Sequence, residues 1–288
     1  MINLIDIRYV RMGTDDIERC VDFATRMVGL QVVRRDENAA YVRGDDRDHN
    51  IVYFKGDPSD HTLGLEVRTV EELAAASAEL EAAGHAVRQG TDAEAAERRV
   101  LRFATFKDPT GNKVDLVVRP YHSGERYYGA RDAGIQDFSH VGLKSSNAPR
   151  DEAFWCKHFN MRVNDWIGPA PLMSFDHVHH RVALFPTDRP GIQHINFQVN
   201  GIDDIMKSWY FLQKHQVKIM FGPGRHPSSS AMFLYFEGPG RIIYEYSHGV
   251  RHLHDGDGWR ARQFPFEQYS FCMWGAVPQI EEFDTVKK

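Results

Sequence analysis

Residues 224–245, GRHPSSSAMFLYFEGPGRIIYE, decide the architecture of this chain. Two apolar, aromatic-rich runs flank the Gly-Pro-Gly sequence at 238–240, and this pattern predicts a β-hairpin. The stretch also carries His226, Tyr235 and Glu245. A glutamate in so apolar a strand is unexpected, because a buried carboxylate is costly unless a metal ion or an arginine meets it.

Two histidines upstream of Glu245 occur in nearly identical settings. His140 lies in FSHVGL (138–143) and His194 in IQHINF (192–197), and each run predicts a strand whose successive side chains alternate between faces. If the three strands share a sheet, the two imidazoles and the carboxylate converge on its concave side. Such a set binds divalent iron and leaves positions open for other ligands. One of these histidines alone could equally be a hydrogen-bonded core residue, so the combination indicates the metal site.

The chain repeats one unit four times. Each unit consists of a strand, a helix and three strands, over residues 5–54, 62–118, 138–186 and 192–247. Paired units would form two half-barrel sheets, so we expect an α+β fold with four βαβββ modules in two domains. The expected boundaries are an N-terminal domain without metal over 1–120, a linker over 121–135, a C-terminal catalytic domain over 136–250 and an aromatic-rich tail over 251–288.

With these motifs the chain resembles the type I extradiol ring-cleavage dioxygenases of the vicinal oxygen chelate superfamily, which includes the 2,3-dihydroxybiphenyl and catechol 2,3-dioxygenases. The family signature is a small residue, any residue, His, five to seven residues, an apolar residue, Tyr, a turn with Pro, and Glu. Here it reads Gly224-Arg225-His226, Leu234-Tyr235, Pro239 and Glu245. The turn lacks the usual Asp-Pro-x-Gly sequence, and serines follow His226 where many members have Asn or Asp. The second difference leaves the ring substituents of the substrate open.

The resemblance implies the vicinal oxygen chelate (glyoxalase-like) fold and an Fe(II)-dependent enzyme of aromatic-compound degradation, with Mn(II) as the alternative ion. Such an enzyme cleaves a catechol-type diol beside its hydroxyl groups and incorporates both atoms of O₂. The implied metal ligands are His140, His194 and Glu245. The family also implies that oligomers are common, so we expect a homo-oligomer.

The resemblance also implies roles for three further residues. His180, in the His179-His180 pair, would lie on the oxygen side of the ion and donate a proton, which suits an imidazole. His226 and Tyr235 would hold the catechol oxygens. His179 is expected to point away from His180 along the same strand, as a partly exposed residue.

Aligning the repeats predicts what the first half offers at the equivalent position. Tyr9, Thr62 and Asp115 correspond to the two histidines and the glutamate of the second half. Without imidazoles this set would bind iron weakly at best. We therefore expect one metal ion per chain.

Composition excludes several other classes. The 288 residues are 42% hydrophobic and 26% charged with a net charge of −5, which is typical of a globular protein and disfavours nucleic-acid binding. No apolar run is long enough to span a membrane. The first residues lack a signal peptide, which favours the cytoplasm. The three cysteines are odd in number and far apart, so a disulfide framework or zinc cluster is not expected.

Three other functions share parts of this pattern. A glyoxalase-like isomerase or lyase would use zinc or nickel and would not need His180, His226 and Tyr235 together. A metal-free binding protein would need a pocket but no ligand set. A hydroxyphenylpyruvate-type oxygenase shares the iron ligands but not the pair His226 and Tyr235. The aromatic tail is expected either to cover the open side of the second domain or to form a subunit contact.

Overall fold

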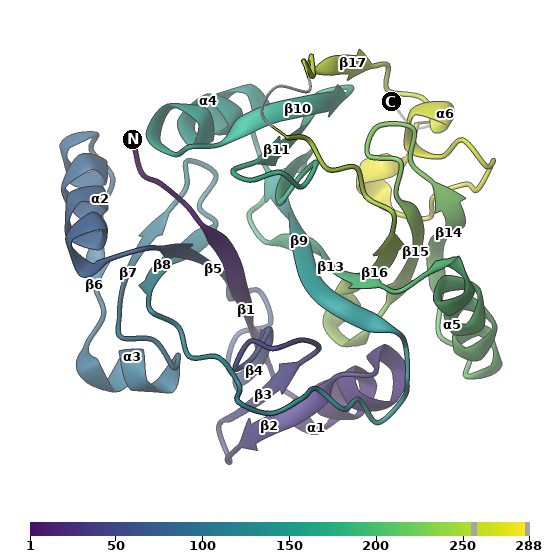
Figure 1. Cartoon of the computed structure of the whole chain (residues 1–288), viewed down its shortest axis with the longest axis horizontal. Coiled ribbons are helices and arrows are strands. Elements are labelled where there is room, and N and C mark those ends of the chain that lie inside the picture. The colour runs from purple at the N-terminus through teal and green to yellow at the C-terminus, as the bar shows by residue number, and fades with distance from the viewer. Residues whose placement is uncertain (255–257, 286–288) are drawn as a thin grey trace.

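The computed structural model describes residues 1–254 and 258–285, which form two curved sheets side by side (Figure 1). The first half consists of β1 (Asp6–Thr14), α1 (Ile17–Asp22), the π-helix η1 (Phe23–Val28), β2 (Gln31–Arg35), β3 (Ala39–Arg43), β4 (Ile51–Lys55), β5 (His61–Val67), α2 (Val70–Ala82), β6 (Arg88–Gln89), α3 (Asp92–Glu97), β7 (Arg102–Lys107) and β8 (Lys113–Val118).

The second half and the tail continue the series. They consist of β9 (Ile135–Ser145), α4 (Ala148–His158), β10 (Arg162–Ile167), β11 (Ala170–Ser174), β12 (Val182–Pro186), β13 (Ile192–Val199), α5 (Ile202–Lys214), β14 (Ile219–Arg225), β15 (Met232–Glu237), the 3-10 turn η2 (Pro239–Arg241), β16 (Ile243–His248), β17 (Arg262–Phe264), α6 (Gln268–Phe271) and η3 (Glu281–Phe283).

Both sheets follow the same pairing rule. The first strand of each unit pairs in parallel with the fourth strand of that unit. The first strands of two units are antiparallel neighbours at the centre of each sheet. The resulting orders are β2-β3-β4-β1-β5-β8-β7-β6 and β14-β15-β16-β13-β9-β12-β11-β10-β17. The expected α+β class, with two sheets of repeated units, is confirmed.

The short helix α3 was not expected. Its N-terminus is a capping box in which the Thr91 hydroxyl accepts from the backbone N–H of Glu94 and the Glu94 carboxylate accepts from the backbone N–H of Thr91. The sequence Thr-Asp-Ala-Glu at 91–94 carries this signature, so the helix could have been predicted.

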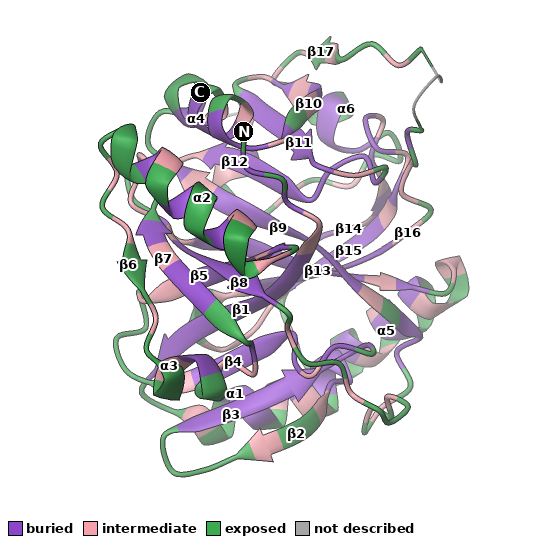
Figure 2. Cartoon of the chain, turned by 60° about the vertical axis from the view of Figure 1, so that its left-hand side comes forward, coloured by how far each residue is buried: buried purple, intermediate pink, exposed green. Residues whose placement is uncertain are grey.

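Apolar side chains of both halves form one continuous core. Helical segments lie where the halves meet: the ring of Phe23 in η1 is 5.7 Å from that of Tyr244 in β16. Likewise, Phe106 of β7 stacks at 5.9 Å on Phe159, the residue after α4. Figure 2 shows the central strands buried and the outer face of α2 exposed.

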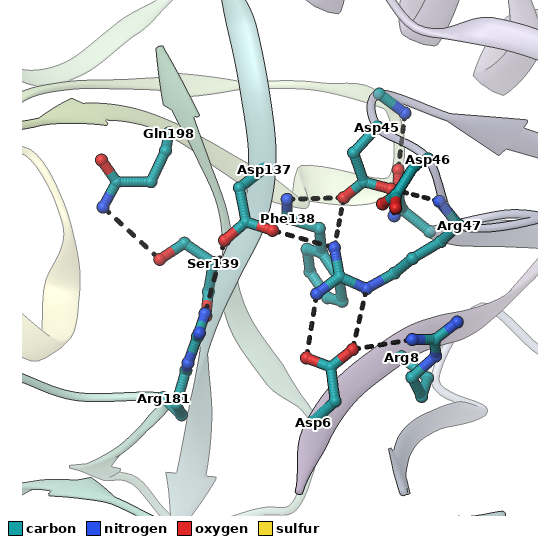
Figure 3. Close-up of polar contacts among 12 residues, drawn as sticks. Asp6, Arg8, Asp45, Asp46, Arg47, Asp137, Phe138, Ser139, Arg181 and Gln198 are labelled. Carbon is teal, nitrogen blue, oxygen red and sulfur yellow. Dashed lines mark hydrogen bonds and ion pairs between the residues drawn. The ribbon is translucent and has the colours of Figure 1, made fainter. Parts of the chain in front are cut away.

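Arg47 joins the two halves through a buried cluster of charges (Figure 3). Its guanidinium donates to Asp6 of β1 and to Asp137 of β9, each at 2.9 Å, and to Asp45 in its own loop. Arg8 donates to Asp6 at 2.7 Å. Burial alone would lower the pKa of Arg47, but the surrounding carboxylates hold this pKa above its ordinary value. The guanidinium therefore stays charged and balances three acids.

Replacing Arg47 by Met is expected to lower the free energy of unfolding by about 3 kcal/mol, because it leaves the buried Asp45 and the partly buried Asp6 and Asp137 without this partner. The value lies at the lower end for such losses because the side chain of Asp137 is 38% exposed. Urea denaturation followed by circular dichroism measures it. The control is Arg26→Met, whose exposed ion pair with Asp22 should contribute less than about 0.5 kcal/mol. Equal losses in both variants would contradict the assignment.

The C-terminal tail packs against the second sheet. β17 pairs in parallel with β10 at the sheet edge. Phe271 and Phe283 are buried, and the ring of Phe283 is 4.9 Å from that of Phe185 in β12. Within the chain the tail therefore covers part of the second half, while Trp274 remains half exposed. Among the described residues, no helix is long and apolar enough to cross a membrane.

Candidate metal centre

The strands β9, β13 and β16 are consecutive in the second sheet and carry the predicted ligands on one face. Asn196 of β13 pairs with His140 on one side and with Glu245 on the other, and His194 lies two residues earlier in β13. Residues two apart in a strand, and residues directly opposite each other, share a face. Tyr235 of β15 pairs with Glu245 and continues the row.

The three candidate ligand atoms meet inside the protein. Nε2 of His140 lies 2.9 Å from Oε2 of Glu245 and 3.0 Å from Nε2 of His194. Nε2 of His194 lies 3.4 Å from Oε2 of Glu245. Oε2 of Glu245 is buried, yet no described residue meets it with hydrogen-bond geometry. Within the described residues, this is the one group of three or more ligand-type side chains whose ligand atoms all lie within 4.8 Å of one another. An unsatisfied buried carboxylate facing two imidazole nitrogens fits a divalent iron.

The protonation states of the centre also suit a metal ion. Burial lowers the pKa of His140 from 6.5 to about 4, so the imidazole is neutral at pH 7. Burial opposes ionisation of Glu245, but the adjacent His140, with further contacts from His194 and His226, holds the pKa of Glu245 well below its ordinary value. Metal ligands must be deprotonated, and these two side chains meet that condition without an ion.

Gln193 and Gly142 orient His194. A register irregularity between Ile192 and His194 breaks the alternation of β13, so Oε1 of Gln193 reaches Nδ1 of its neighbour. Nδ1 therefore carries the hydrogen, and Nε2 keeps its lone pair for the centre. A side chain at Gly142 would place its Cβ 2.4 Å from Nδ1 of His194, so the ring requires glycine there. Regular alternation would place the side chains of Gln193 and His194 on opposite faces, so this contact was not expected. The sequence carries no signal of the register irregularity.

The structure also brings His226 and Tyr235 together. His226 directly follows β14, and its Nε2 lies 3.2 Å from the Tyr235 hydroxyl, while its Nδ1 lies 2.7 Å from the carbonyl oxygen of Phe271 in α6. A carbonyl only accepts, so Nδ1 of His226 carries the hydrogen and Nε2 is an acceptor. Burial, together with nearby Glu245, raises the pKa of Tyr235 well above 10, so the phenol stays protonated.

The His179-His180 pair lies in the bend before β12 and not in a strand. His180 is buried with its ring centroid 4.3 Å from that of His140, beside the candidate ligands. Burial lowers the pKa of His180 well below 6.5, which keeps the ring neutral at pH 7. The expectation that His179 is partly exposed is wrong, since it is fully buried. In a bend, unlike a strand, neighbouring side chains need not point to opposite faces.

The first half holds an arginine at the equivalent position. Gly64 of β5 pairs with Tyr9 and Asp115. In the second sheet, Asn196 pairs with His140 and Glu245 in the same way. The Tyr9 hydroxyl donates to Oδ2 of Asp115 at 3.0 Å, and Nε of Arg98 donates to the same oxygen at 2.7 Å. A cavity of about 660 Å³ opens here, and its lining includes Thr62, Arg98 and four further cationic side chains. This largely cationic lining does not suit a metal ion.

We expect one iron ion per chain after loading and desalting, measured by elemental analysis. Asp115→Asn should leave this ratio unchanged, because Arg98, and no pair of imidazoles, is the positive partner of that carboxylate. Two tightly bound ions per chain, or loss of the ion in Asp115→Asn, would contradict the prediction.

Comparison with known proteins places the fold. A family model described as the Glyoxalase/Bleomycin resistance protein/Dioxygenase superfamily matches residues 6–116 and again residues 137–246, one pair of units each time. The chain is 25% identical to a biphenyl-2,3-diol 1,2-dioxygenase of Sphingomonas paucimobilis over 93% of the chain and 92% of that protein. It is 26% identical to an iron-dependent extradiol dioxygenase of Rhodococcus jostii (strain RHA1), over 95% and 97%.

A solved structure has the same fold. The crystal structure of a halotolerant catechol dioxygenase superposes with a TM-score of 0.87 at 21% identity, covering 98% of this chain and 97% of that one. The family model matches well over half of the sequence. The chain therefore belongs to the Glyoxalase/Bleomycin resistance protein/Dioxygenase superfamily.

Proposed function

We propose that this protein is an Fe(II)-dependent extradiol dioxygenase that cleaves catechol-type aromatic diols with incorporation of both atoms of O₂. The observation that carries the proposal is the convergence of His140, His194 and Glu245 at contact distance. The relatives described above bear the names of extradiol enzymes, and one is named as iron-dependent, which supports the same reaction and the same metal.

The candidate ligands set the charge of the site. When bound there, Fe(II) supplies an electrophilic centre with open positions for a diol and for O₂. His140, His194 and Glu245 together carry one negative charge, so the loaded site keeps a net positive charge and favours an anionic diol. Mn(II) is the alternative ion, because the same donor atoms accept either metal.

Tyr235 and His226 hold the oxygen atoms of the diol. Nε2 of His226 accepts a hydrogen bond because its Nδ1 donates to the carbonyl of Phe271. The protonated Tyr235 donates to the diol oxygen once that oxygen is ionised. This pair thus binds one neutral hydroxyl and one oxyanion with matched donors and acceptors.

His180 moves a proton. Its buried, neutral ring can take the proton of a diol hydroxyl and return it as the ring opens, and positioned proton transfer of this kind typically accelerates a reaction by about 10²–10⁴-fold. The overall reaction adds both atoms of O₂ and breaks the ring bond next to the diol. The product is a yellow semialdehyde or keto-enoic acid.

The other functions of this superfamily fit the site less well. A fold alone does not decide function. An isomerase or lyase of the glyoxalase kind would not need His180, His226 and Tyr235 around its metal, and a metal-free binding protein would not need an unsatisfied buried Glu245. A hydroxyphenylpyruvate-type oxygenase would not require the His226–Tyr235 pair, whose atoms lie 3.2 Å apart.

The test is oxygen uptake with a panel of diols. Protein purified without O₂ and loaded with Fe(II) is mixed with catechol, with biphenyl-2,3-diol and with a glutathione hemithioacetal as a glyoxalase substrate. We expect one O₂ consumed per diol and a yellow product, with no change of the hemithioacetal. Turnover of the hemithioacetal alone would favour the isomerase, and iron-loaded protein that consumes no O₂ with any diol would overturn the proposal.

Four points remain predictions: the metal and substrate roles of the named residues, the domain boundaries at 120, 135 and 250, self-association, and a cytoplasmic location. The exposed Tyr269, Trp274 and Val277 of the tail are apolar residues that self-association would cover. Size-exclusion chromatography with light scattering measures the oligomeric state directly.

A further inference from the structure

A second group of buried polar side chains lies directly behind His180. Nδ1 of His179 lies 3.2 Å from Nδ1 of His180, and Nε2 of His179 lies 2.9 Å from Oδ2 of Asp165 in β10. His179 and Asp165 are both fully buried. Neither belongs to the candidate ligand set, although burying an acid is costly without a compensating partner.

Arg262 supplies the compensation for Asp165. It lies in β17, the tail strand that pairs with β10. Its backbone N–H and its Nε donate to Oδ1 of Asp165 at 2.8 and 3.0 Å, and its Nη2 donates to Oδ2 at 2.6 Å. A carboxylate held by an arginine fork is ionised and can only accept hydrogen bonds.

This acceptor dictates the direction of the whole chain of hydrogen bonds. Because Asp165 accepts, Nε2 of His179 carries the hydrogen. A neutral imidazole has a single N–H, so Nδ1 of His179 accepts and Nδ1 of His180 donates. The hydrogen of His180 is thereby held on Nδ1, directed toward His179. Nε2 of His180 therefore keeps its lone pair.

We propose that Asp165 and His179 are positioning residues that select the tautomer of His180, so that its Nε2 receives the hydroxyl proton of an arriving diol. The inference rests on the proposed function for the identity of that proton donor. The opposite tautomer would present an N–H to the diol and could not take its proton. In the proposed step the diol O–H bond breaks, an N–H bond forms at Nε2, and Nδ1 keeps its hydrogen toward His179. Arg262 makes the C-terminal tail part of this arrangement.

The near-isosteric variant Asp165→Asn tests the direction of the hydrogen bonds from His180 through His179 to Asp165. Two Arg262 donors meet Oδ1 and only one meets Oδ2, so the amide oxygen should remain at the Oδ1 position and the amide NH₂ should face His179. His179 must then accept through Nε2 and donate through Nδ1. His180 must in turn accept at Nδ1, which moves its hydrogen to Nε2.

The tautomer is read by ¹⁵N NMR of histidine-labelled, full-length, metal-free protein, with the ring signals of His180 assigned from their loss in His180→Gln. In the wild type the hydrogen is expected on Nδ1 of His180, and in Asp165→Asn on Nε2. This readout does not depend on turnover. It therefore stays informative even if diol cleavage itself is disproved.

Kinetics of the iron-loaded enzyme provide the second readout. Asp165→Asn is expected to lower kcat by about 10- to 100-fold, the usual cost of losing an outer partner of a site, with little change in KM. His179→Asn should retain more activity than His179→Ala, because its amide oxygen can still accept from Nδ1 of His180. The matched control is Asp176→Asn, a carboxylate that holds Arg181 at 2.8 Å without touching His179. This control should keep both the tautomer and kcat.

Two results would overturn the inference. One is an unchanged His180 tautomer in a folded Asp165→Asn protein. The other is a wild-type His180 whose hydrogen already resides on Nε2. If Asp165→Asn does not fold, the His179→Asn and His179→Ala pair decides, and equal kcat in these two variants would count against the role of His179.

Discussion

Replacing Glu245 by Ala is expected to abolish iron retention and diol cleavage. Loss of an outer partner of a metal site typically costs about 10- to 100-fold, and removing a direct ligand should exceed this range. Glu245 is 1% exposed and its Oε2 has no hydrogen-bonded partner among the described residues, so its ionised oxygen is available to the ion. Elemental analysis after desalting measures the metal, and oxygen uptake measures turnover.

The stability of the metal-free protein separates this role from a structural one. A buried carboxylate without a satisfied partner is costly, so Glu245→Gln should unfold at or above the wild-type temperature when both lack metal. The control is Glu237→Ala in β15, a partly exposed residue 3.8 Å from Lys218, which should keep its iron. A strongly destabilised metal-free Glu245→Gln protein with normal iron content would remove Glu245 from the ligand set.

Replacing His180 by Ala is expected to leave one iron per chain and to slow turnover by about 100-fold or more. The ring lies 4.3 Å from that of His140 but is not one of the converging ligands, so its loss removes proton transfer and not metal binding. Metal analysis and kcat are measured on the same preparation.

The exposed His215 at the end of α5 provides the matched control, and His215→Ala should behave as the wild type. Unchanged turnover in His180→Ala would exclude this residue from the mechanism. Loss of iron in the same variant would instead indicate that His180 belongs to the metal centre.

The positions of the metal centre could be predicted because each of its residues stands out locally. His140, His194 and Glu245 are polar residues in apolar alternating strands, and such residues are expensive to bury without a purpose. The repeat then relates the strands to one another, so that Tyr9, Thr62 and Asp115 of the first half could be aligned with them before any coordinates were known.

The partners of these residues could not be predicted, because they come from distant parts of the chain. The carbonyl of Phe271 reaches His226 across 45 positions, and Arg262 reaches Asp165 across 97. Neither contact follows from alternation or from a motif. His179 is wrongly expected to be partly exposed for the same reason, since the acid that it meets, Asp165, lies in β10.

The chain itself therefore determines two sheets of repeated units and a buried acid at the centre of each, because side-chain alternation and the repeat are local properties of a sequence. Which partner each acid meets is a property of the folded protein. Asp115 meets the guanidinium of Arg98, which a short helix brings to the concave face of the first sheet, whereas Glu245 meets two imidazoles from neighbouring strands. A buried carboxylate requires a positive partner, and only the tertiary structure decides whether an arginine supplies it or the site is left for a metal ion.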